Sequence, residues 1–194
     1  MDQCWVHNYY PETKLQSKQW KHGNSPVPKK AKALPSSGKV ILSVFWDCRG
    51  ALLTDYSSKG QTITAKYYCE LLTKLRGAIK EKRRRKLTKG VRLHHDNAPT
   101  HLAHVTAAHS GSLGYEILPY PPYSPDRPPS DFFHFPRMKS TVRGKHIRDD
   151  GEVITQVELF LNSQNEEFYR TGLRQLMHRW QKCVTLGGFY VERY

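Results

Sequence analysis

The sequence predicts an α/β protein whose mixed sheet is flanked by helices. Strand-like segments follow one another up to residue 56, a helical stripe of apolar residues begins near residue 64, and strand and helix patterns alternate after residue 90. Successive strands favour antiparallel pairing, whereas alternation with helices favours parallel pairing. A length of 194 residues suits one domain over residues 1–194.

The first strands are expected at residues 3–10, 39–46 and 51–56. Residues 3–10 are rich in aromatic and β-branched side chains, and a second short strand at 15–20, after the turn signal of Pro11 and Glu12, would complete a hairpin. Residues 39–46 are nearly continuously apolar, as in a strand that is buried on both faces. Residues 21–38 are rich in proline, glycine, serine and lysine, which predicts a mobile loop insertion.

A long helix should begin after Thr64, whose hydroxyl can cap it. Its apolar residues recur at helical spacing and form one stripe for packing on the sheet. They are Tyr68, Leu71, Leu72, Leu75 and Ile79.

The alternating part of the chain should contain strands at 91–95 and 115–118. Between them we expect a helix from Pro99 to about His109, with Leu102 and Val105 turned inward. This order predicts that the two strands are parallel.

Two further helices are expected at residues 151–161 and 166–183, both on the outer face of the sheet. Ser163 and Glu166 have the spacing of a capping box for the second helix. Gly172, Leu176 and Trp180 are four residues apart on this helix.

The charge balance points to a polyanionic partner. Lys and Arg number 31 against 17 acidic residues, a formal net charge of +14, and nucleic acid is the leading candidate. Acidic lipid is the alternative, but the longest apolar run, residues 40–46, is far shorter than the roughly 20 residues that span a bilayer. We therefore predict no membrane partner.

One stretch, residues 80–92, carries eight of the basic residues and a single Glu. We predict nonspecific DNA contacts there, with a solvated helix end as the alternative. The candidate contact residues are Lys82, Arg83, Arg84, Arg85, Lys86 and Lys89. The same run could act as a nuclear-import signal, which predicts a nuclear protein.

The four cysteines, Cys4, Cys48, Cys69 and Cys183, form no CxxC pair. They fit a reducing intracellular setting and indicate neither a zinc ribbon nor a thioredoxin-like site. We also reject a zinc site made by the histidines around residues 94–104, since the first two would point to opposite faces of a strand.

Two aspartates stand where predicted elements end or begin. Asp96, in LHHDNAPTH, follows a predicted strand, and Asp131, in YSPDRPPSDFF, opens a predicted helix, with 34 residues between the two aspartates. Open sheets keep their functional sites at such ends. Without further context, Asp96 could instead be an acid that interacts with a helix dipole. Asp126 is read as a structural turn residue.

These two motifs resemble the catalytic domain of mariner-family transposases. In that family an aspartate of an HDNAxxH motif is followed, after 34 residues, by one in YSPDLAPSD. The likeness extends to WVHNYYPETKLQSKQW near the start, VFWDCRG at 44–50, RGKHI at 143–147 and RWQKCV at 179–184. The resemblance implies a ribonuclease-H-like sheet and places Asp2, in MDQCW, on the first aspartate of the family's GDExW motif.

The resemblance also implies an activity and its site. Asp2, Asp96 and Asp131 would bind two Mg²⁺ ions, with Mn²⁺ possible, for DNA strand cleavage and strand transfer in cut-and-paste transposition. The partners would be double-stranded DNA, as transposon ends and target, and a second copy in a homodimer, without a small-molecule cofactor.

This chain departs from the family pattern in several places. Gln3 replaces an acidic residue, Arg127 and Pro128 replace Leu and Ala, and Pro136 should limit the helix that carries Asp131. Nothing corresponds to the helix-turn-helix modules that precede the family's catalytic domain, and we expect a domain truncated at its N-terminal edge. A catalytically decayed or domesticated DNA-binding remnant, or a host nuclease of the same fold, are the alternatives.

Overall fold

The computed structural model describes residues 1–8, 10, 38–57, 60–120, 128–145, 147–188 and 191. In this part of the chain, β1 (Asp2–His7), β2 (Lys39–Asp47) and β3 (Gly50–Ser57) form an antiparallel sheet in that order. β4 (Val91–Leu93) and β5 (Tyr115–Ile117) form a parallel pair. Both predicted pairing modes are confirmed. The expected strand at 15–20 and all of the predicted loop except Gly38 lie outside the described residues.

A hydrogen bond joins the two sheets. The amino group of Met1 donates to the carbonyl of His94 at 2.6 Å, which brings the start of β1 beside the chain that leaves β4. The chain that leaves the carboxyl end of β4 therefore lies next to the residue that precedes β1, while β1–β3 and β4–β5 are two separately hydrogen-bonded sheets.

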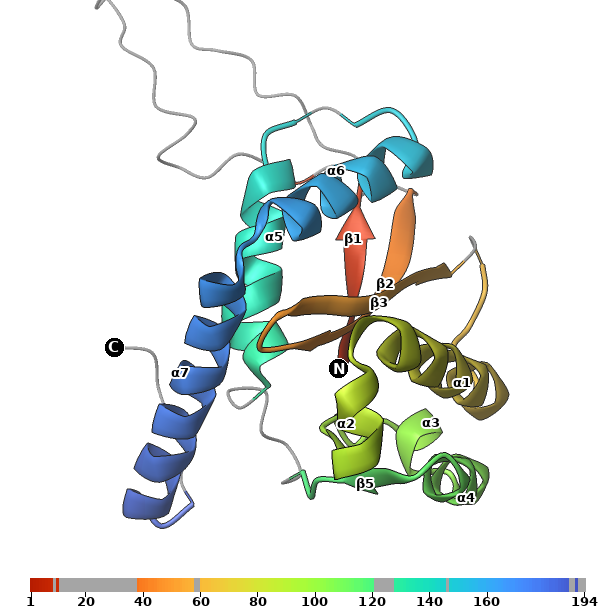
Figure 1. The fold of residues 1–194 in the computed structure, drawn as a ribbon. Coiled ribbons are helices and arrows are strands. Elements are labelled where there is room, and N and C mark those ends of the chain that lie inside the picture. Colours follow the sequence, from red (N-terminus) through yellow and green to blue (C-terminus); the bar gives the residue numbers. More distant parts are fainter. Residues whose placement is uncertain are drawn as a thin grey trace, which may run out of the picture.

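Helices cover both faces of the three-stranded sheet (Figure 1). On one face, Phe45 and Leu52 pack with α1 (Ala65–Lys82) and with Leu93 and Tyr115 of the parallel pair. On the other face, Leu42 and Val44 pack with α5 (Phe135–Val142) and α6 (Asp150–Ser163). Because β2 serves both cores, its residues are buried almost without interruption, as predicted.

The helix α1 agrees with its predicted cap and its predicted apolar stripe. The hydroxyl of Thr64 accepts a hydrogen bond from the N–H of Tyr67 at 3.2 Å, and all five predicted stripe residues are buried. A second, short helix, α2 (Arg84–Lys89), follows α1 directly at Arg83. The basic run thus lies on the last turn of α1 and on α2.

The helix expected from Pro99 to about His109 is instead two helices, α3 (Pro99–Leu102) and α4 (His104–Ser112). They are separated at Ala103, whose ψ of 139° is extended. The break changes which side of the segment faces the core, so the prediction of inward side chains was wrong: Leu102 and Val105 are 61% and 55% exposed. Polar side chains are buried instead, among them Thr106, whose hydroxyl donates to the carbonyl of Thr100 at 2.7 Å.

The last helix, α7 (Glu166–Thr185), is capped by Asn165, whose side chain accepts from the N–H of Phe168 at 2.9 Å. The predicted capping box at Ser163 was wrong, because Ser163 still belongs to α6 and donates to the carbonyl of Phe160. Gly172 and Leu176 are buried, whereas Trp180 is 39% exposed. The first half of α7 lies against the sheet, where Tyr169 contacts the ring of Trp46 on β2, whereas Leu176 further along packs on Phe132 and Phe133.

Asp131 lies on η1 (Ser130–His134), a π-helical turn that continues into α5. The N–H of Phe135 bonds to the carbonyl of Ser130, so the turn holds one residue more than an α-helical turn. Pro136 consequently falls in the first turn of α5, where a missing N–H is tolerated. The expectation that Pro136 limits this helix was therefore wrong.

No helix in the described ranges is long and apolar enough to cross a membrane.

Candidate active site

The three predicted acids come from three elements that meet where β1 begins. Asp2 is the first residue of β1, Asp96 lies in the turn between β4 and α3, and Asp131 is in the first turn of η1. Their charges act on one another: Asp131 raises the pKa of Asp2, and Asp96 raises the pKa of both Asp2 and Asp131. The structure thus brings together three carboxylates that are distant in sequence.

Asp2 is buried, with 8% of its surface exposed. One carboxylate oxygen accepts the N–H of Gln3 at 2.7 Å, and the other, Oδ2, is buried without a hydrogen-bond partner among the described residues. Burial, and next the charge of Asp131, raise the pKa of Asp2 to about 7, against the opposing effects of the Met1 amino group and the Gln3 N–H. A buried carboxylate oxygen without a donor is costly, and a bound cation would remove this cost.

The pKa of Asp96 is shifted in the opposite direction from that of Asp2. Oδ1 of Asp96 accepts hydrogen bonds from Nδ1 of His101 at 2.6 Å and from the N–H of Ala98 at 3.2 Å. The His101 hydrogen bond is the largest effect on the pKa of Asp96, which is lowered although partial burial opposes this. Asp96 is therefore a carboxylate at neutral pH. Both bonds end on Oδ1, which leaves Oδ2 available as a ligand atom.

Asp131 is exposed on η1. Desolvation of its carboxyl group by the surrounding protein, and then the charge of Asp96, raise its pKa, whereas Lys139 on α5 lowers it. Asp131 therefore shares with Asp2 an excess of negative charge that the nearby side chains do not fully neutralise.

The carboxylate oxygens of the three aspartates are suitable ligands for a divalent cation. Carboxylate oxygens are hard ligands of the kind that Mg²⁺ and Mn²⁺ prefer. A bound cation would relieve the repulsion that raises the pKa of Asp2 and Asp131, and it would give Oδ2 of Asp2 a partner. Within the described part of the chain, however, no three Asp, Glu, His or Cys side chains are already arranged to coordinate one ion.

The histidines of the motif lie on two sides of the chain. His94 contacts the rings of Tyr120 and Trp180, whereas His95 and His101 stack on Tyr68 in the core beside α1. His101 is a site residue that our reading of the sequence missed. Its position five residues after Asp96, as the final residue of HDNAxxH, was the available signal.

The basic run separates into two groups. Lys82 donates to the carbonyl of Leu52 at 3.0 Å, and Arg83 and Lys86 pair with the buried carboxylate of Asp47 at 3.5 and 2.7 Å. These three cations hold α1 and α2 against the β2–β3 hairpin. The other three predicted contact residues, Arg84, Arg85 and Lys89, are exposed. DNA contact by this run remains a prediction.

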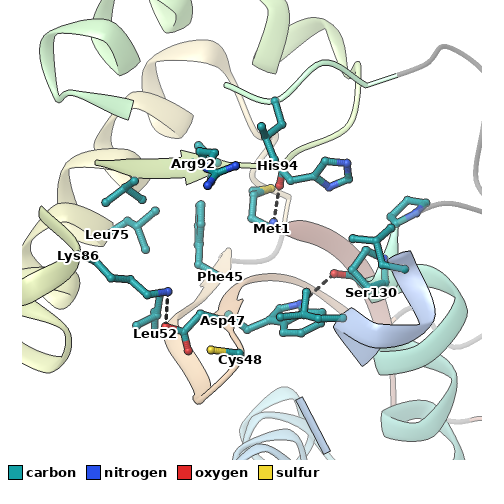
Figure 2. Close-up of a pocket in the computed structure, with 18 of the residues that line it drawn as sticks. Met1, Phe45, Asp47, Cys48, Leu52, Leu75, Lys86, Arg92, His94 and Ser130 are labelled. Carbon is teal, nitrogen blue, oxygen red and sulfur yellow. Dashed lines mark hydrogen bonds and ion pairs between the residues drawn. The ribbon is translucent and has the colours of Figure 1, made fainter. Parts of the chain in front are cut away.

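A cavity of about 290 Å³ adjoins the site (Figure 2). Apolar side chains from α1, β2, β3, β4 and α7 contribute to its wall, and the Asp47–Lys86 pair lies at one end. Met1 and His94, which share a hydrogen bond, also line it, but none of the three aspartates does. The cavity is therefore a neighbour of the acidic site and not part of it.

Comparison with known proteins connects this geometry to a family. Residues 10–89 match the model described as "Transposase (partial DDE domain)". Over 192 residues, 98% of this chain, the sequence is 30% identical to human histone-lysine N-methyltransferase SETMAR, of which it covers 28%. It is also 30% identical to the mariner Mos1 transposase of Drosophila mauritiana over 98% of this chain and 55% of that protein. The chain thus spans about half or less of these relatives.

Solved Mos1 structures have the same fold. The paired end complexes with Mn and with Mg superimpose with a TM-score of 0.89 and 30% identity, over 98% of this chain and 55% of theirs. The Mos1 strand transfer complex gives a TM-score of 0.87 at the same identity and coverage. The isolated Mos1 catalytic domain is 32% identical, with a TM-score of 0.76, over 80% of this chain and 77% of that one. Sequence and fold together therefore show that this chain belongs to the mariner family of transposases and corresponds to the family's ribonuclease-H-like catalytic domain.

Proposed function

We propose that this chain is the catalytic domain of a DNA transposase that cleaves DNA strands and joins the freed 3′ end to target DNA. The observation that carries the proposal is the meeting of Asp2, Asp96 and Asp131 from three separate elements, with mutual effects on their pKa values. Groups of acids with shifted pKa values at the end of a sheet, raised here for Asp2 and Asp131, are typical of functional sites. The family relationship supports the same activity.

The three aspartates would hold divalent metal, Mg²⁺ or Mn²⁺, as two ions. Bound metal would activate the attacking oxygen and neutralise charge on the phosphodiester. The chain's own contribution is to keep Asp96 ionised through His101 and to hold Asp2 in a buried, rigid strand. The Mos1 complexes with Mn and with Mg are consistent with either ion.

The proposed partner is double-stranded DNA, as transposon ends and target. The net charge of +14 and the exposed Arg84, Arg85 and Lys89 support binding to a polyanion. A homodimer is proposed from the family relationship alone. The basic run at 80–92 supports a nuclear location, because runs of this composition can act as import signals.

A second candidate is a DNA-binding remnant that has lost catalysis. It is favoured by one observation, namely that the described residues hold no preformed set of three metal ligands. The carboxyl group of Asp2, with its pKa raised to about 7, would then be a buried acid that carries its full charge only above neutral pH when no metal binds.

Nicking of supercoiled plasmid DNA in Mg²⁺ or Mn²⁺ separates the two candidates. We expect the wild-type chain to nick DNA only with metal, and Asp96→Asn to lose this activity. The control is Glu116→Gln, which removes the same charge from an exposed position on β5. A wild-type chain that binds DNA but never nicks it would favour the remnant.

A second assay separates a transposase from a nuclease of the same fold. It supplies a DNA end that is already cut at an inverted repeat, together with a target plasmid. A transposase joins the 3′ end to the plasmid, whereas a nuclease yields only nicked products. Joining that is lost in Asp96→Asn would establish strand transfer.

A further inference from the structure

The carboxylate of Asp96 is supported by a buried aromatic stack of three residues, which come from α1, from the turn after β4 and from α3. Tyr68 on α1 is fully buried, and His95 and His101 are each 4% exposed. The ring of His101 lies 4.2 Å from that of Tyr68 and 5.0 Å from that of His95, at interplanar angles of 39° and 26°. The Tyr68 hydroxyl and Nδ1 of His95 are 3.0 Å apart, within hydrogen-bond distance. The three rings therefore restrain one another.

The His101 ring is oriented by this packing and, among the residues that the structure describes, has one polar contact to a side chain. Its Nδ1 lies 2.6 Å from Oδ1 of Asp96, and Nε2 is buried without a partner among the described residues. A hydrogen on Nε2 would be a buried donor without an acceptor, which is costly. The hydrogen therefore belongs on Nδ1, where it is donated to Asp96.

We propose that His101 is a positioning residue that fixes Asp96 for binding a divalent cation, and that Tyr68 and His95 hold the His101 ring in place. The inference rests on the proposed function and deepens it, since it names the support of one expected metal ligand. A carboxylate held through Oδ1 loses rotational freedom before the cation arrives and keeps Oδ2 for binding. Hydrogen-bonded support of ligand side chains is known to tune metal sites in this way.

The first test of the hydrogen bond between His101 and Asp96 compares the Mn²⁺ affinity of substituted proteins with that of wild type. The affinity is measured by calorimetric titration of the 194-residue protein without DNA. His101→Leu removes the donor but keeps an apolar side chain in the stack, and we expect its affinity for Mn²⁺ to fall by about 10- to 100-fold. His101→Asn can place an amide N–H near the position of Nδ1, so its affinity should stay closer to wild type. The control is His104→Leu, at an exposed position on α4.

Activity gives a second readout with a distinct signature. Plasmid nicking by His101→Leu should be slow at low Mn²⁺ and recover as the Mn²⁺ concentration rises, because the ligand itself is still present. Asp96→Asn should not recover. A variant that is merely less well folded would not show this dependence on metal, and its melting curve would reveal the loss.

The ring nitrogens of His101 provide a test that is independent of metal. In ¹⁵N-labelled protein we expect the hydrogen on Nδ1, and a hydrogen found on Nε2 instead would overturn the proposal. Folded His101→Leu with wild-type Mn²⁺ affinity would also overturn it, while the proposed function would stand. Equal Mn²⁺ affinity in wild type and Asp96→Asn would reject the metal site, and with it both proposals.

Discussion

The ammonium group of Lys86 lies 2.7 Å from Oδ2 of Asp47 and connects α2 to the end of β2. Arg83 approaches the same oxygen at 3.5 Å, and the N–H of Arg49 donates to Oδ1 at 2.8 Å. Asp47 is therefore the anchor for a chain segment that is otherwise strongly basic. This pair also explains why part of the basic run is half-buried and not fully solvated.

Asp47→Asn should destabilise the fold. It leaves two cations beside a neutral side chain, and the loss of charge-assisted hydrogen bonds predicts a decrease of about 2 kcal/mol in the free energy of unfolding. Denaturation by urea at neutral pH measures this. Glu116→Gln, with the same charge change at an exposed site, should stay within about 0.5 kcal/mol of wild type. Equal stability of the two variants would show that the ion pairs of Asp47 do not contribute to the free energy of unfolding.

The same cluster predicts a dependence on acid pH. Burial alone would raise the pKa of Asp47, but Lys86, the Arg49 N–H and Arg83 together lower it below its usual value of 3.8. The stabilisation is therefore complete above the unfolded-state pKa and is lost as pH falls through the lower folded-state pKa. Wild type should lose more stability than Asp47→Asn when pH is lowered below about 4.

His134 predicts a second pH dependence, at higher pH. It is fully buried, stacks on Trp46, and has no hydrogen-bond partner for either ring nitrogen among the described residues. Burial lowers its pKa from 6.5 to about 4. Between these values the unfolded chain binds a proton that the folded chain does not, so stability falls as pH is lowered through this window.

The contribution of His134 can be isolated by His134→Phe, which keeps a ring in the stack and cannot titrate. The loss of stability between pH 7 and pH 4 should be smaller in the variant by about 3 kcal/mol. Denaturant midpoints at the two pH values give the comparison. If wild type and variant lose the same amount, other groups are responsible for the acid sensitivity.

Gly172 is needed for close contact between α7 and its neighbours. A Cβ atom at this position would lie 2.9 Å from Phe133 Cδ1 and 3.3 Å from Trp46 Cη2, both in rings that are packed on other elements. Gly172→Ala should therefore cost about 1–3 kcal/mol through overpacking. The matched control is Gly77→Ala on α1, where nothing lies within 4 Å, and it should gain about 0.5–1 kcal/mol. A gain at both positions would mean that the rings move aside without cost.

The sequence predicted those parts of the fold in which local pattern and tertiary packing agree. The apolar stripe of α1 and the nearly continuous burial of β2 are examples, because one face or both faces of these elements meet the core. The division of α3 from α4 could not be read, since Ala103 carries no glycine or proline signal. The π-turn at Ser130 was hidden for a similar reason: its extra residue is recognisable only from hydrogen bonds.

The candidate site shows the same contrast. Asp96 and Asp131 stand in distinctive motifs, whereas Asp2 was found through the resemblance alone. His101 and Asp47 were missed because their roles depend on partners that a sequence pattern does not identify. Asp47 belongs to a turn-like segment, and only the fold reveals that α2 returns to it with Lys86.

The exposed part of the basic run predicts a measurable salt effect on DNA binding. Arg84 and Arg85 lie on the outer side of α2 and, within the described ranges, form no ion pair, unlike Arg83 and Lys86. If each contacts a phosphate, Arg84→Gln/Arg85→Gln should weaken binding to unrelated DNA sequences alike and reduce the slope of log affinity against log salt by about 2.

The control for this variant is Arg170→Gln/Arg174→Gln on α7, which removes the same charge from residues that already pair with Glu166 and Glu167. Fluorescence anisotropy with short duplexes over a range of salt concentrations gives both slopes. If α2 contacts phosphates directly, the slope of log affinity against log salt should change in the α2 variant and stay the same in the α7 variant. An equal decrease in both variants would instead show that DNA responds to the total charge of the domain, because the site of the lost charges would then be irrelevant.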